Sequence, residues 1–195
     1  MEAVHVVGVC GSLRDESTTR LALEHALEAA SAAGASTTLL DLREYDLPAF
    51  DADRDRETAG DAAQLANELQ AADAILLGSP MYHGSYASPL KTAIDYCGFD
   101  EFEDTTVGLL AVSGGAFPVT ALEHLRSVCR SLKAWVLPHQ AAIPNAHSAL
   151  EDGEFVDEKL ADRVATLGQR AVQYATIEPD PGSLESDQNV GAEGK

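Results

Sequence analysis

The chain has few of the residues that would direct it to a metal, a disulfide framework or a membrane. It has only three cysteines, Cys10, Cys97 and Cys129, far apart and without a CxxC or paired Cys/His spacing. We therefore expect buried free thiols and no metal site. No run of eighteen apolar residues exists, so no transmembrane helix is expected. The first residues, Met1-Glu2-Ala3, lack the basic start of a signal peptide, which predicts a cytoplasmic protein.

Positive charge is also scarce. The chain has 13 Lys and Arg against 32 Asp and Glu, which gives a formal net charge of −19. This balance disfavours binding to nucleic acid or to an anionic membrane surface. Because the acidic residues are spread along the chain, we interpret them as a solvated coat rather than as a specific acid-binding site. Such a coat suits a cytoplasm with very high salt, where charge repulsion is screened.

The length and the apolar content are sufficient for one domain. With 195 residues, 45% of them apolar, the chain can bury a sizeable core. We predict a single domain over residues 1–177. From Glu178 onwards the sequence EPDPGSLESDQNVGAEGK predicts a disordered acidic tail over residues 178–195.

Predicted strands and helices alternate along the chain. Apolar, β-branched runs predict strands at 4–10, 36–42, 74–78, 106–112 and 135–137. Helices are expected after each of them, the first capped by Ser17 or Thr18 and the third by Ser88 with Pro89 as its first helical residue. This alternation indicates a parallel sheet covered on both faces. Five strands in this length favour a flavodoxin-like three-layer α/β sandwich, with a parallel sheet of order 2-1-3-4-5.

Three loops rich in glycine and serine follow strands that this order makes neighbours. They run from Gly11 to Ser17, from Pro80 to Ala87 and from Ser113 to Val119. In this fold the ligand binds at the carboxyl ends of the strands, at the switch between strands 1 and 3. The order therefore predicts one site built from all three loops.

The first loop, GSLRDES, has the features of a phosphate site. The N-terminus of a helix presents free N–H groups and the positive end of its dipole. Ser12 and Ser17 can add hydroxyl donors, and Arg14 a guanidinium fork. Neither GxxxxGK[ST] nor GxGxxG is present, so a triphosphate or dinucleotide cradle is unsupported. For this loop alone, a capped turn with a solvated arginine explains the residues equally well.

The second loop suggests a flat ligand. Pro80 fixes the exit of the chain from the strand, and Gly84 permits close approach of a ligand to the backbone. Tyr82 and His83 supply rings beside it, and such a loop can bind a planar heterocycle. Taken alone, His83 is better explained as a surface histidine.

In the third loop, Gly114 and Gly115 also permit close backbone approach, and Phe117 could flank a ligand. A plain turn explains this loop equally well in isolation.

These motifs in combination resemble the NADPH-dependent FMN reductase family. They are GSLRxxS after strand 1, SPxYHGSYxxxLKxAID after strand 3 and VSGG after strand 4. The segment LREYDLPAFDAD at 42–53 is similar to an extra loop of that family, and the likeness runs from about Val4 to Pro138.

The resemblance implies FMN as the cofactor and assigns roles to the three loops. Ser12, Arg14 and Ser17 would bind the phosphate; Pro80, Met81, Tyr82, His83, Gly84 and Ser85 would line the isoalloxazine ring, with Ser113, Gly114 and Gly115 on its other side.

The implied reaction is hydride transfer from NADPH or NADH to FMN and then to a small-molecule acceptor. Acceptors in the family include free flavin, quinones, azo compounds and metal oxyanions. No catalytic side chain is expected, because the flavin carries the chemistry. A homodimer or homotetramer is also implied, and Tyr45, Leu47, Pro48 and Phe50 in the long segment 43–60 support it, since the sheet offers them no obvious place.

Two alternatives share the fold. A non-catalytic electron carrier of the flavodoxin type would also bind FMN, and an acidic surface suits docking to basic partners. The long segment 43–60 and the YHGSY sequence favour the reductase. A phospho-receiver domain needs clustered aspartates at the end of strand 1, where this chain has Val9-Cys10-Gly11-Ser12, and we set it aside.

Overall fold

The computed structural model describes residues 3–176, so the tail predicted for 178–195 lies outside the described residues. Five parallel strands form the sheet in the order β2-β1-β3-β5-β6, which confirms the predicted flavodoxin-like order. They are β1 (His5–Cys10), β2 (Ser36–Asp41), β3 (Ala74–Tyr82), β5 (Thr106–Val112) and β6 (Trp135–Ile143). A short strand, β4 (Ser85–Tyr86), pairs antiparallel with the end of β3.

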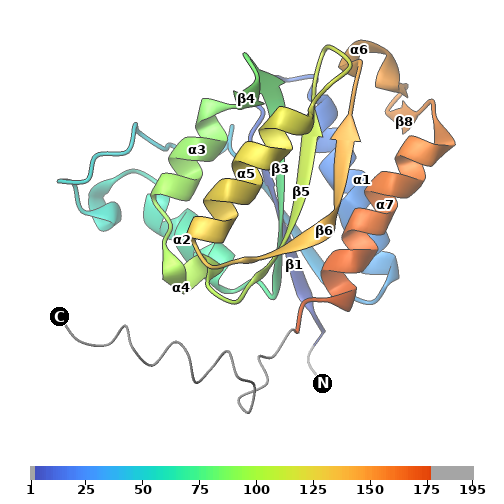
Figure 1. Ribbon diagram of the computed structural model, residues 1–195. Coiled ribbons are helices and arrows are strands. Elements are labelled where there is room, and N and C mark those ends of the chain that lie inside the picture. The colour runs from blue at the N-terminus through green and yellow to red at the C-terminus, as the bar shows by residue number, and fades with distance from the viewer. Residues whose placement is uncertain (1–2, 177–195) are drawn as a thin grey trace.

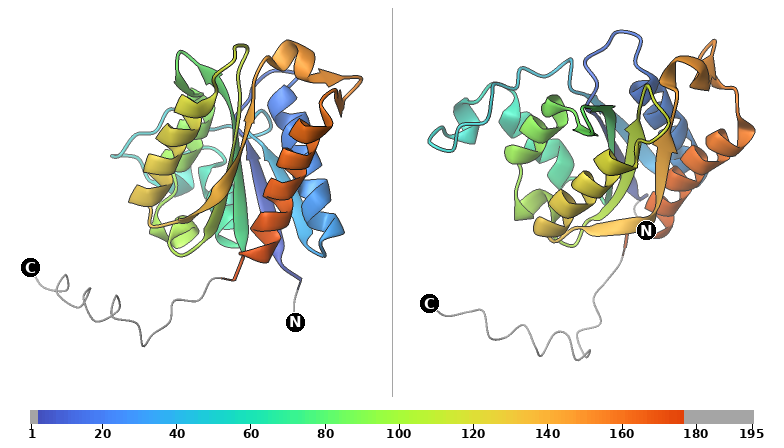
Figure 2. Two further views of the ribbon diagram at one scale, coloured as in Figure 1. Left: turned by 45° about the vertical axis from the view of Figure 1, so that its right-hand side comes forward. Right: turned by 45° about the horizontal axis from the view of Figure 1, so that its top comes forward.

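Helices cover both faces of the sheet (Figures 1 and 2). On one face lie α1 (Thr18–Ala32) and α7 (Glu158–Gln173), and on the other α2 (Ala62–Gln70), α3 (Ser88–Asp95) and α5 (Val119–Ser131). The shorter elements are the 3-10 helix η1 (Arg56–Thr58), α4 (Phe99–Phe102), α6 (Ala146–Ala149) and the hairpin of β7 (Leu150–Glu151) and β8 (Glu154–Phe155). Within residues 3–176, none of the helices combines the length and the apolarity needed to cross a membrane.

The central strands read as continuous apolar runs because both of their faces are buried. In β1, Val6 and Cys10 pack in the core beneath α1 and α7, whereas Val7 and Val9 pack in the core beneath α2, α3 and α5. Every residue of β5 is buried. A strand covered on one face only would show alternation instead.

Two strands are longer than predicted. β3 continues to Tyr82 because its last residues pair with β4 in a hairpin. β6 continues to Ile143, past Pro138, whereas the prediction stopped at residue 137. Proline lacks a donor for the sheet, but β6 is an edge strand, and its pairing with β5 shifts register between Val107 and Leu109.

The predicted helix caps are partly confirmed. Ser17 caps α1 and accepts a hydrogen bond from the N–H of Arg20 at 3.1 Å. The prediction that Ser88 caps α3 is wrong, because α3 begins at Ser88 and Ala87 precedes it as the cap. The alanine has no side-chain acceptor, and its own N–H donates to the buried Oγ of Ser79 at 2.8 Å.

Helices α1 and α7 pack through small residues. A Cβ atom built on Gly168 would lie 1.8 Å from the carbonyl oxygen of Ala26 and 3.2 Å from the nitrogen of Ala30. Since no real Cβ approaches backbone this closely, glycine at residue 168 sets the distance between the two helices. That distance also fixes α1, whose N-terminus lies at the predicted site.

We expect Gly168→Ala to destabilise the protein by up to about 2 kcal/mol, because overpacking costs about 1–3 kcal/mol and the gain in helix propensity offsets about 1 kcal/mol of this cost. Urea unfolding measures the free energy, and Gln169→Ala, an exposed change on the same helix, should leave it nearly unchanged. A Gly168→Ala protein as stable as wild type would show that the helices adjust freely.

Candidate functional site

The three predicted loops meet around one cavity at the carboxyl edge of the sheet, the upper edge in Figure 1. The cavity has a volume of about 860 Å³, within the range of small-molecule sites. Eight of the twelve predicted site residues line it: Ser12, Arg14, Ser17, Pro80, Met81, Tyr82, Ser113 and Gly114. The structure thus brings together eight of the predicted residues, from the ends of β1, β3 and β5.

The loop after β1 places donors at the start of α1. The side chains of Ser12 and Ser17 are buried in the cavity wall. The first turn of α1 contains no acidic residue, and the first N–H groups of any helix lack carbonyl acceptors within it. These donors and the helix dipole favour an anion at this position.

Two arginines stand beside these donors. Arg14 is exposed and forms no ion pair with any residue of the described chain. Arg20 also lines the cavity; it pairs with Glu24 at 2.7 Å, but its Nε atom is buried and lacks an acceptor in residues 3–176. A bound anion would supply acceptors for the exposed guanidinium of Arg14.

The loop after β3 is a tight hairpin rather than an open loop. His83 and Gly84 have φ angles of 51° and 82°, so both residues adopt the left-handed conformation that a two-residue hairpin turn requires. The turn by itself therefore favours glycine at residue 84. His83 lies at the tip of this turn.

Hydrogen bonds hold the hairpin at its base and at its side. The buried Ser79 hydroxyl donates to the carbonyl of Pro80 at 2.9 Å and accepts from the N–H of Ala87. Ser85 Oγ lies 2.9 Å from Nδ1 of His124 on α5. The hairpin that carries Met81 and Tyr82 is thereby fixed against α5.

The loop after β5 is tied to the chain that leaves β6. The N–H of Asn145 donates to the carbonyl of Gly115 at 3.0 Å, and the N–H of Ala146 donates to that of Ser113 at 2.9 Å. Ser113 Oγ donates to the carbonyl of Gly115 at 2.6 Å. These bonds orient a loop whose next residue, Gly114, presents bare backbone to the cavity.

Four predicted site residues lie outside the cavity wall: His83, Gly84, Ser85 and Gly115. The first three form the turn and outer strand of the hairpin. A Cβ atom on Gly115 would have no heavy atom within 4 Å, so space is open beside this residue.

The sequence prediction missed a further wall of the cavity. It consists of residues after β6, namely Ala146, His147, Leu150, Asp152 and Gly153. The prediction ended the fifth strand at residue 137, so it did not bring this segment to the site. The order 2-1-3-4-5 was the available signal, because the fifth strand must also end at this edge. Thr18, Thr19 and Arg20, at the start of α1, were missed as well.

The cysteines do not form a reactive centre. All three thiols are free; Cys10 and Cys129 are buried, as predicted, and Cys97 is partly buried. Burial raises the pKa of Cys97 and of Cys129 to about 12, and it also raises that of Cys10. The thiolate, which is the reactive form, is therefore disfavoured.

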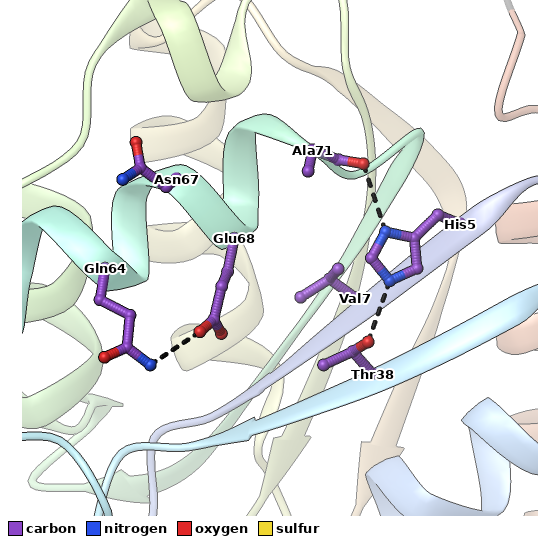
Figure 3. Close-up of a pocket in the computed structure, with 7 residues that line it drawn as sticks. All are labelled: His5, Val7, Thr38, Gln64, Asn67, Glu68 and Ala71. Carbon is purple, nitrogen blue, oxygen red and sulfur yellow. Dashed lines mark hydrogen bonds between the residues drawn. The ribbon is translucent and has the colours of Figure 1, made fainter.

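A second hollow, of about 500 Å³, lies between β1, β2 and α2 (Figure 3). His5 places its Nδ1 atom 3.2 Å from the carbonyl of Ala71 and its Nε2 atom 2.9 Å from Thr38 Oγ1. Gln64 is likewise paired with Glu68 at 2.9 Å. Because these polar groups already have partners, this hollow is a weaker candidate than the cavity at the carboxyl edge.

The fold is that of a flavodoxin-like α/β protein, with a cavity at the switch point of its sheet. The family model for the NADPH-dependent FMN reductases matches residues 4–148. The chain belongs to this family.

The curated relatives extend beyond the part that the chain matches. An FMN-dependent NADPH-azoreductase of Staphylococcus aureus (strain USA300) is 36% identical over 118 residues. These residues make up 59% of this chain and 63% of the azoreductase, so the match spans less than two thirds of that protein.

Solved structures share the fold at low sequence identity. A flavoenzyme NAD(P)H:(acceptor) oxidoreductase (FerB) from Paracoccus denitrificans superposes with a TM-score of 0.75 at 20% identity, over 89% of this chain and 97% of that one. An NADH:FMN oxidoreductase (EMOB) in its apo form gives 0.73 at 20% identity, over 91% and 92%. A flavodoxin from the domain Archaea gives 0.64 at 13% identity, over 88% and 99%.

Proposed function

We propose that the protein is an FMN-dependent NAD(P)H oxidoreductase. The observation that carries this proposal is the convergence of a loop rich in donors after β1, the hairpin after β3 and the glycine-containing loop after β5 on one cavity of about 860 Å³. Membership of the NADPH-dependent FMN reductase family supports it.

The residues present fit FMN. A phosphate needs donors and positive charge. The start of α1 and the loop before it offer two buried serine hydroxyls, free N–H groups and Arg14, which forms no ion pair within residues 3–176. A flat ring needs bare backbone at its edge and apolar or aromatic cover on its face; Gly114 after β5 offers the first, and Met81 and Tyr82 after β3 offer the second. We assign Ser12, Arg14 and Ser17 to the phosphate, and to the ring Pro80, Met81, Tyr82, His83, Gly84, Ser85, Ser113, Gly114 and Gly115.

When bound, FMN would supply the hydride and electron transfer. The role of the protein is to bind the cofactor and to orient it. Arg14 and the start of α1 would hold the charged end, and the hairpin fixed by Ser79 and Ser85 would set the position of the ring. The open space at Gly114 and Gly115 would admit the nicotinamide to one face of the ring.

The acceptor is proposed as a class. The relative from Staphylococcus aureus is an azoreductase, and that name supports an azo compound as the electron acceptor here. The family description, FMN reductase, supports a free flavin, and we include quinones in the proposed class. The described residues near the cavity include no basic pair beyond Arg14 and Arg20, so we propose that either NADPH or NADH can serve as donor.

A flavodoxin-type electron carrier is the competing function. It has support from the likeness in fold to a flavodoxin. A carrier shields the ring faces, however, whereas here the glycines at 114 and 115 leave open space. We therefore favour the reductase.

We place the protein in the cytoplasm. Free Cys10, Cys97 and Cys129 suit a reducing compartment. Recovery of the natural protein in a secreted fraction would contradict this proposal.

We expect Arg14→Ala to weaken FMN binding by about 1.5–3 kcal/mol, because a charge-assisted contact to phosphate is lost. Riboflavin, which lacks the phosphate, should bind the variant as it binds wild type. Titration calorimetry of both ligands at one salt concentration measures the effect. Arg130→Ala, an exposed arginine of α5, is the matched control. Equal losses for both ligands would show that Arg14 acts elsewhere.

We expect Gly115→Trp to slow reduction of bound flavin by NAD(P)H about tenfold or more, because the indole would displace the nicotinamide. FMN affinity should stay within about twofold, since a Cβ atom at residue 115 would meet no heavy atom within 4 Å and Gly115 lies outside the cavity wall. Anaerobic stopped-flow bleaching of the flavin measures the rate, with Gly115→Ala as the control. If neither nicotinamide bleaches wild type while dithionite does, the carrier function is correct.

We propose a homodimer or homotetramer with a surface adapted to high salt. Exposed apolar residues support assembly, among them Phe50, Phe117 and Trp135, and the net charge of −19 supports the second point. Light scattering and urea unfolding across a salt series should show an oligomer at molar salt and stability that rises with salt. A monomer at molar salt would contradict the oligomer. Maximal stability in dilute buffer would contradict the adaptation to high salt.

A further inference from the structure

Arg43 joins the end of β2 to the loop that follows β1. Its Nε atom donates to both carboxylate oxygens of Asp41 at 3.0 Å, and its Nη2 atom donates to Asp41 Oδ2 at 2.5 Å. Its Nη1 atom donates to the carbonyl oxygen of Arg14 at 3.4 Å and lies 3.5 Å from Asp15 Oδ1. One guanidinium therefore reaches two carboxylates and one backbone carbonyl.

Asp41 holds Arg43 at a fixed position on the sheet. Asp41 is 6% exposed, and it lies opposite Cys10 in the register of β1 and β2. Burial alone would raise the pKa of Asp41, but hydrogen bonds and charge from Arg43 outweigh it and hold the pKa below its usual range. A buried carboxylate is costly without a partner, so Arg43 is held in place.

Arg43 is not part of the cavity wall. Its effect on a ligand must therefore pass through the residues it contacts. It donates to the backbone carbonyl of Arg14, and it places a positive charge 3.5 Å from Asp15, an exposed carboxylate that itself lines the cavity. Both contacts favour an anion next to Ser12 and Ser17.

We propose that Arg43 is a positioning residue for the phosphate end of the ligand, acting through Arg14 and Asp15. The proposal rests on the proposed FMN function. Without Arg43, the loop would lose its link to β2, and the charge of Asp15 would face the phosphate uncompensated.

The test compares FMN with riboflavin. We expect Arg43→Ala in the full chain to weaken FMN about tenfold, as for loss of one charge-assisted contact, while riboflavin changes less than about twofold. Arg43→Lys should restore part of the affinity, because it returns the charge near Asp15 without the fork. Fluorescence titration at one salt concentration gives both dissociation constants.

A double-mutant cycle tests the route through Arg14. If Arg43 acts by positioning Arg14, Arg14→Ala should cost less in the Arg43→Ala background than in wild type. Adding Asp15→Asn to Arg43→Ala should recover the electrostatic part of the loss. Additive effects of Arg14→Ala and Arg43→Ala, with no recovery by Asp15→Asn, would overturn the proposal.

Arg56 provides a matched control on the same segment. It donates to Glu101 Oε1 at 2.8 Å and to the carbonyl of Tyr96 at 3.2 Å. Like Arg43, it therefore bonds one buried carboxylate and one backbone carbonyl. Arg56→Ala should lower stability without changing the ratio of FMN to riboflavin affinity. If it changes this ratio as Arg43→Ala does, or if Arg43→Ala weakens both ligands equally, the role of Arg43 is only structural. A wild-type protein that binds no FMN would instead refute the proposed function itself.

Discussion

The pairing of β1 with both β2 and β3 is the constraint on which the site depends. From this central strand the chain crosses to α1 on one face of the sheet, whereas α3, which follows β3, lies on the other face. The loops after β1 and β3 are neighbours, yet the helices that they enter diverge. The cavity lies between the two loops, and the donors at the start of α1 face it. The loop that we propose for the phosphate and the hairpin that we propose for the ring thus become adjacent through strand order alone.

The charge of the whole chain and the charge of the site oppose one another. A net charge of −19 repels an anionic ligand at long range, but salt screens that repulsion beyond about 10 Å at 0.1 M. Direct contacts with N–H groups, hydroxyls and Arg14 act over shorter distances and are screened less. An acidic surface and the proposed anion site are therefore compatible, and Arg43, 3.5 Å from Asp15, offsets part of the negative charge beside that site.

Strand order and the three loops could be predicted because they follow from local patterns: apolar runs, glycine and serine at the strand ends, and a capping serine at residue 17. The parts that could not be predicted depend on pairing between distant residues. β4 exists only because Ser85 and Tyr86 pair back onto β3, and β6 passes Pro138 because it lies at the sheet edge. The wall formed by residues after β6 was missed for the same reason. Nothing in the sequence around Arg43 indicates that its guanidinium reaches the carbonyl of Arg14.

The long segment 43–60 is held in place by hydrogen bonds within the same chain, without a second subunit. Its two ends are tied together, because the N–H of Asp46 donates to the side chain of Asp61 and the N–H of Asp61 donates to the carbonyl of Asp46. Its middle is held by Tyr96, whose hydroxyl lies 3.2 Å from the carbonyl of Pro48. These bonds compensate part of the entropy that a long loop loses on folding. They leave Phe50 47% exposed, with one edge packed on Tyr96. A second subunit is therefore not needed to order this segment; what it would add is the burial of Phe50.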